Sequence, residues 1–140
     1  MDIHNRQERI ASALNHLAKR ADVSENNKVT IRRIADHLYA RGISHGRVHK
    51  YLTTLPSIAA WLGKDFELAD RNDIEHVVAE VERQDWSGWT KRDYKTLLKY
   101  FYKWLRGMEE FPPEVKWVKT RMGVRQKTLP EDLLTANEIF

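Results

Sequence analysis

The longest regular pattern in this sequence is SGWTKRDYKTLLKYFYKWLR, which covers residues 87–106. Its apolar residues recur at steps of three and four, the spacing that gathers side chains on one face of an α-helix. Ser87 is suited to cap this helix and Gly107 to end it. The stretch therefore predicts one long amphipathic helix, whose inner face consists of Tyr94, Leu97, Leu98, Phe101, Trp104 and Leu105.

The same spacing extends outward over most of the chain. A helix is expected over residues 4–22, and Asn27 is expected to cap the next one, which ends near Gly42. Ser44 and Asp70 are suited to cap two more helices. Glycine (6) and proline (4) are scarce, which disfavours a many-stranded fold. We predict an all-α fold, a compact bundle of four to five short helices plus an additional N-terminal helix.

One residue conflicts with the pattern of the helix expected between Ser44 and Gly63. Pro56 lies inside it and cannot donate a hydrogen bond to the carbonyl of Leu52. A kink, or a helix in two pieces, is expected there. After the break at Pro112 and Pro113, a short helix is expected around 114–118.

Composition excludes several classes of function. The 140 residues lack cysteine, which rules out disulfides, thiolate zinc sites and thiol catalysis. His45 and His49 are four residues apart, but no further ligand pair stands nearby, so no metal or other cofactor is expected. No glycine-rich phosphate loop or Ser-His-Asp arrangement is visible. The absence of a long apolar run and of a signal-peptide pattern predicts a cytoplasmic protein without a membrane partner.

Charge is unevenly distributed along the chain. The net charge is only +4 and the pI is about 9.4, but residues 87–106 carry +5 and residues 114–127 carry +4. Residues 65–85 carry −6. A basic side and an acidic side are therefore expected, and this polarity favours a nucleic-acid partner. Within the longest helix, a basic stripe opposite the apolar face is predicted from Lys91, Lys95, Lys99 and Lys103.

Two segments repeat each other at an offset of 43 residues. The residues of the first are Ser44, Tyr51, Leu55, Trp61 and Leu62, and those of the second are Ser87, Tyr94, Leu98, Trp104 and Leu105. One interpretation is that two core helices need similar starts and similar apolar faces. The other is that both helix starts face one ligand, since both are rich in hydroxyl and cationic groups that bind phosphate. Ser44 and Ser87 serve as caps under either interpretation.

Three segments, in order, resemble a known family. The first segment comprises Asn27-Lys28 and residues 42–52 (GISHGRVHKYL). The second covers residues 87–105. The third covers residues 129–139 and begins Leu129-Pro130-Glu131-Asp132-Leu133. Together they are similar to the SAM-like core-binding domain of tyrosine recombinases and phage integrases, most like archaeal Xer-type members. The resemblance implies a core-binding domain over 25–118, a basic linker over 119–128, and the start of a truncated catalytic domain over 129–140. The helix expected from the apolar spacing at the start of the chain then forms a separate N-terminal element over 1–24.

In that family the domain pairs with a catalytic domain to clamp duplex DNA, and presents two helices to the major groove. Carried over by position, the DNA contacts implied are Ser44, His45, Arg47, Lys50, Ser87, Thr90, Lys91, Arg92, Lys95 and Lys99. In the linker, Arg121, Arg125 and Lys127 are expected to follow the DNA backbone. Implied partners are double-stranded DNA, the catalytic domain of the same full-length protein and other recombinase protomers on DNA. The isolated chain is expected to be a monomer.

The sequence also departs from the family pattern. The catalytic arginine, lysine, His-x-x-Arg motif and tyrosine nucleophile belong to the catalytic domain, and no such motif follows Thr135. This chain is therefore expected not to be an enzyme, although a full-length parent would be a tyrosine recombinase. Arg47 stands where many relatives carry threonine. The N-terminal helix lies outside the resemblance, and its role is left open.

Two other functions fit parts of the sequence. A helical protein-interaction module with an acidic partner would use Trp89, Tyr100 or Tyr102 as exposed anchors. DNA binding would instead depend on residues such as Lys91 and Arg47. A helix-turn-helix regulator needs two short helices and a tight turn, which residues 41–43 could provide.

Overall fold

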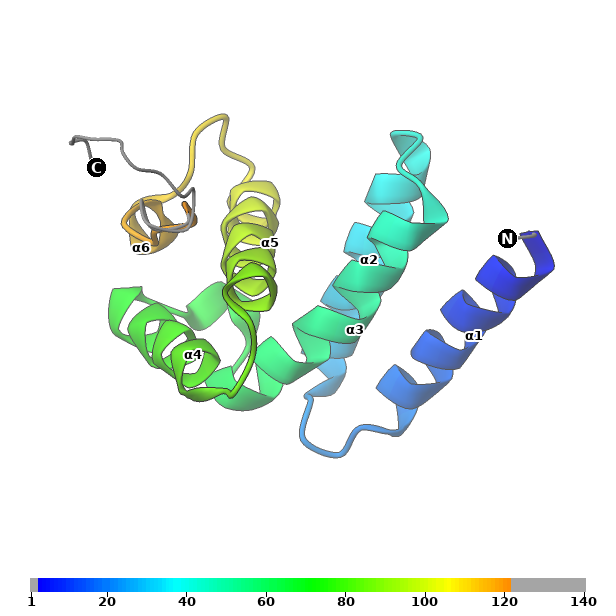
Figure 1. The fold of residues 1–140 in the computed structure, drawn as a ribbon, viewed down its shortest axis with the longest axis horizontal. Coiled ribbons are helices and arrows are strands. Elements are labelled where there is room, and N and C mark those ends of the chain that lie inside the picture. The colour runs from blue at the N-terminus through cyan, green and yellow to red at the C-terminus, as the bar shows by residue number, and fades with distance from the viewer. Residues whose placement is uncertain (1–2, 122–140) are drawn as a thin grey trace, which may run out of the picture.

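The computed structural model describes residues 3–121, and within this range every regular element is helical (Figure 1). The elements are α1 (Ile3–Lys19), α2 (Glu25–Ala40), α3 (His45–Leu62), the 3₁₀ turn η1 (Phe66–Leu68), α4 (Arg71–Arg83), α5 (Gly88–Arg106) and α6 (Pro113–Lys116). The predicted all-α class is therefore confirmed. None of these helices is both long and apolar enough to span a lipid bilayer.

Most helix ends follow local sequence signals. The hydroxyl oxygens of Ser44 and Ser87 accept the backbone amides three residues ahead, at 3.3 Å and 3.2 Å. Asp70 and Asp73 form a reciprocal capping box at the start of α4. Gly63 ends α3 with a φ of 71°, a left-handed conformation in which glycine has no steric cost.

The predicted cap at Asn27 is wrong. Ser24 caps α2, and its hydroxyl oxygen accepts the amide of Asn27 at 3.1 Å. Asn27 is the third residue of the helix and is buried. Its amide group is used elsewhere in the fold, as described below.

Of the two outcomes expected at Pro56, a kink or a helix in two pieces, the second is wrong. The helix continues from His45 to Leu62 as one element (Figure 1). Pro56 itself is buried, and the turns on both sides of it bury Leu52, Leu55, Ile58 and Ala59. We attribute the continuity to this packing, which offsets the loss of one backbone hydrogen bond.

The helices form two groups. In Figure 1, α1 and α3 lie side by side with α2 behind α3, and α4, α5 and α6 gather on the other side. The core runs through both groups, where Phe66 meets Phe101 edge to face with ring centroids 4.6 Å apart. Tyr102 is fully buried, so it is not the exposed anchor that a protein-interaction module would need.

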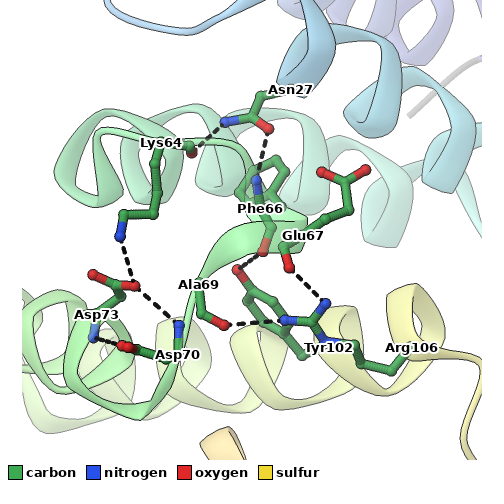
Figure 2. A network of polar contacts seen from close by, with 9 residues as sticks. All are labelled: Asn27, Lys64, Phe66, Glu67, Ala69, Asp70, Asp73, Tyr102 and Arg106. Atoms are coloured by element: carbon green, nitrogen blue, oxygen red, sulfur yellow. Dashed lines mark hydrogen bonds and ion pairs between the residues drawn. The ribbon is translucent and has the colours of Figure 1, made fainter.

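A polar network joins the two groups around the segment between α3 and α4 (Figure 2). The side chain of Asn27 donates to the carbonyl of Lys64 and accepts the amide of Phe66, both at 2.9 Å. From α5, the Tyr102 hydroxyl donates to the Phe66 carbonyl at 2.9 Å. Arg106 donates to the carbonyls of residues 67 and 69 at 2.8 Å and 3.1 Å. This network ties α2 to α5.

The N-terminal helix packs on α3 through buried Ala13 and Leu17. Its last turn is held by the buried side chain of Lys28, whose ammonium donates to the carbonyl of Ala18 at 3.0 Å and to Glu25 at 3.1 Å. An ammonium at a helix C-terminus also compensates the negative end of the helix dipole. In this way α1 is fixed beside α3.

Candidate nucleic-acid interface

The start of α3 presents hydroxyl, imidazole and guanidinium groups. Ser44 and Arg47 are exposed, and His45 is half-buried with its Nδ1 2.9 Å from the hydroxyl of Tyr39. Burial raises the pKa of Tyr51, and the nearby charge of Arg47 opposes that rise. The guanidinium of Arg47 therefore lies near the Tyr51 hydroxyl, above the core.

The start of α5 has a similar composition. The hydroxyls of Ser87 and Thr90 lie 3.2 Å apart. Trp89 is 63% exposed and so does not belong to the core. The guanidinium of Arg92 lies 5.9 Å from the centre of the Trp89 ring, a cation–π geometry at an exposed site.

An ion pair joins these two helix starts. The ammonium of Lys50 on α3 lies 2.9 Å from the Asp93 carboxylate on α5. Arg47 lies one turn before Lys50, and Trp89 lies one turn before Asp93, so both belong to the same side of their helices as the ion pair. We call the two starts, with the Lys50–Asp93 pair between them, the junction surface.

Like Lys50, two further predicted contact lysines form ion pairs within the chain. The ammonium of Lys95 lies 2.6 Å from the carboxylate of Glu82 on α4. Lys91 reaches the other oxygen of the same carboxylate at 3.7 Å and donates to the Glu82 carbonyl at 3.0 Å. The bond from Lys95 lowers the pKa of Glu82.

The other two lysines of the expected stripe turn toward the end of the described chain. Lys99 donates to the carbonyl of Val118 at 2.9 Å, and desolvation lowers its pKa. The ammonium of Lys103 lies over the rings of Tyr100 and Phe111. The four lysines of the predicted stripe are therefore half-buried, because α4 and the segment after α5 cover part of them.

Four arginines near the two helix starts differ from Lys91 and Lys95 in that they form no ion pair among the described residues. Within residues 3–121, Arg47 and Arg92 form no ion pair, and the same is true of Arg6 and Arg9 on α1. Sequence reasoning did not select Arg6 and Arg9, because nothing near them in the sequence indicates what α1 packs against. These four guanidinium groups are therefore not neutralised by an ion pair within the described residues and are available to an anionic ligand.

Arg6 and Arg9 line a hollow of about 290 Å³ at the start of α3. Its other lining residues are Ser44, His45, Gly46 and His49. Desolvation and the charge of Arg9 lower the pKa of His49. We call this the α1–α3 hollow.

The remaining predicted residues lie near or beyond the described end. Arg121 is exposed at the last described position, and Arg125 and Lys127 lie outside the described residues. Among the described residues, no three potential metal-binding side chains come together in a way that could hold an ion. The arrangement suits the binding of an anion by guanidinium and hydroxyl groups. Comparison of the chain with protein-family models, with curated proteins and with solved structures gives no match.

Proposed function

We propose that this chain is the DNA-binding core-binding domain of a tyrosine recombinase or integrase. The observation that carries the proposal is the junction surface, in which the Lys50–Asp93 pair brings two serine-capped helix starts together. The sequence resemblance assigns DNA contacts to these same two helix starts. Arg47 and Arg92 are the main cations of the proposed surface.

The proposed binding mode follows from the chemistry of these groups. Guanidinium groups form paired hydrogen bonds with phosphate or with a guanine edge, and the hydroxyls of Ser87 and Thr90 reach phosphate. Lys91 and Lys95 can contact a phosphate only after their ion pairs with Glu82 break. The domain binds and does not cleave; its further proposed partners are a catalytic domain of the same protein and other protomers, in the cytoplasm.

Binding by one half of a clamp should be weak and strongly dependent on salt. If four to six phosphates are neutralised, log K should fall with log salt at a slope of about −4 to −5. Fluorescence anisotropy of a labelled duplex of about 20 base pairs, titrated with the 140-residue chain at several salt concentrations, measures both quantities.

Matched variants assign the binding surface. Arg47→Ala with Arg92→Ala should weaken binding by about 10-fold or more, because two phosphate contacts are lost. Lys19→Ala with Lys116→Ala also removes two exposed positive charges, but from the end of α1 and from α6, and should have little effect. Equal losses in the two double variants would mean that only net charge matters, and would overturn the proposed surface.

One observation favours a second candidate, a protein-interaction module. Trp89 is 63% exposed and Tyr100 is 49% exposed, and large exposed aromatic residues are typical anchors of protein interfaces. If the wild-type chain fails to bind duplex DNA at low salt, this candidate replaces the first. A capture experiment that depends on Trp89 and not on Arg47 would then support it.

A further inference from the structure

The α1–α3 hollow adds a second set of cations next to the junction surface. It combines side chains from two helices, and every titratable group that lines it is basic: Arg6, Arg9, His45 and His49. Its volume of about 290 Å³ has room for about ten water molecules. A concave site of this kind repels other cations and suits an anionic group.

The walls of the hollow are held in place from both sides. Leu17 is buried, and Lys28 binds the last turn of α1, so the helix cannot separate easily from α3. On the α3 side, the Tyr39 hydroxyl lies 2.9 Å from Nδ1 of His45. The helix that carries Arg6 and Arg9 is therefore positioned beside α3 before any ligand arrives, which reduces the ordering cost of binding.

The repulsion within the hollow is visible in one side chain. Partial burial is the main cause that lowers the pKa of His49, and the charge of Arg9 lowers it further. The charged groups facing His49 from α1 are Arg6 and Arg9, and His45 is its basic neighbour on α3. An anion placed among these groups would relieve the repulsion.

We propose that the α1–α3 hollow binds a backbone phosphate of duplex DNA, through Arg6 and Arg9, so that α1 extends the DNA-binding surface. This inference rests on the proposed function. Ser44 connects the hollow to the junction surface, because it lines the hollow and also caps the helix that carries Arg47. One DNA backbone running past the start of α3 would meet both sets of arginines.

The test compares two double variants in the anisotropy titration described above. Arg6→Gln with Arg9→Gln should weaken duplex binding by about 10-fold and make the salt slope shallower by about 1 to 2, since one or two phosphate contacts are lost. Lys19→Gln with Lys116→Gln removes the same charge from other places and should change neither quantity substantially. All four side chains are exposed, so both variants should fold.

The outcomes separate this inference from the proposed function. If Arg47→Ala with Arg92→Ala weakens binding but Arg6→Gln with Arg9→Gln matches its control, the hollow is not a phosphate site and the proposed function stands. If wild-type chain does not bind the duplex, the proposed function itself fails. A second readout on the wild-type chain is the imidazole NMR signals of His45 and His49, which should shift on adding duplex; unchanged signals would overturn the inference.

Discussion

The ammonium of Lys50 and the carboxylate of Asp93 lie 2.9 Å apart, and each is the sixth residue of its helix. They are also 43 residues apart, the offset at which α3 and α5 repeat each other in sequence. Equivalent positions of the two repeated segments therefore meet in space at this ion pair. The pair neutralises one of the cations of the junction surface.

Asp93→Asn should therefore strengthen DNA binding. The change releases Lys50 and removes a negative charge that a phosphate would face, and we expect a gain of about 3- to 10-fold at low salt. The free energy of unfolding should change by less than about 1 kcal/mol, because the pair is exposed. Anisotropy and urea denaturation measure the two effects. Asp22→Asn, at an exposed acid after α1, is the control, and an equal gain there would contradict the prediction.

Glu82→Gln should also strengthen DNA binding. The substitution weakens the attachment of Lys91 and Lys95 to α4, so that both lysines can turn toward a phosphate. We expect the salt slope to become steeper by about 1 to 2. Glu75→Gln removes a carboxylate from the same helix without releasing these lysines. The prediction is contradicted if the two variants show the same slope.

Asn27→Ala should destabilise the fold and leave the DNA-binding surface unaltered. It leaves the amide of Phe66 and the carbonyl of Lys64 without their side-chain partner, at a cost of about 1–3 kcal/mol. The neighbouring Asn26 bonds Glu67 at the surface, so Asn26→Ala should cost less than about 0.5 kcal/mol. Urea denaturation compares the two; equal losses would mean that the buried network contributes little.

The pKa of His49 predicts how stability depends on pH. Its value in the folded chain lies below the usual 6.5, so folding favours the neutral imidazole. As the pH falls through 6.5, the unfolded chain takes up a proton more readily than the folded chain, and stability decreases. His49→Gln should lose less stability between pH 7 and pH 5 than the wild type, as measured by urea denaturation. His76→Gln, at an exposed position on α4, should behave like the wild type.

Much of the fold could be predicted because its signals are local. The caps at Ser44, Ser87 and Asp70 each need partners only three residues away, and the apolar spacing sets the inner face of each helix. The prediction of Asn27 as the cap was wrong because asparagine and serine are both good caps, and the serine that forms the cap, Ser24, lies three residues earlier. Only the segment at 64–66, far away in the sequence, explains why Asn27 is needed inside the helix.

The candidate site was less predictable, because its lysines bind partners that are far away in the sequence. Glu82 is 13 residues from Lys95, and the carbonyl that Lys99 binds is 19 residues away. Spacing along one helix shows which lysines share a face but not which element covers that face. The arginines of α1 were missed for the same reason, because their position depends on tertiary packing.

The bond between Asn27 and the Phe66 amide has a consequence for how this domain opens. Phe66 is buried, and its amide proton points to a side chain from α2 while its carbonyl accepts from α5. That proton can exchange with solvent deuterium only when the 64–69 segment separates from α2. If its exchange is as slow as that of the core amides, the two helix groups unfold together as one cooperative unit. A single backbone amide can thus report whether the segment that follows α3 ever separates from α2 in the absence of a ligand.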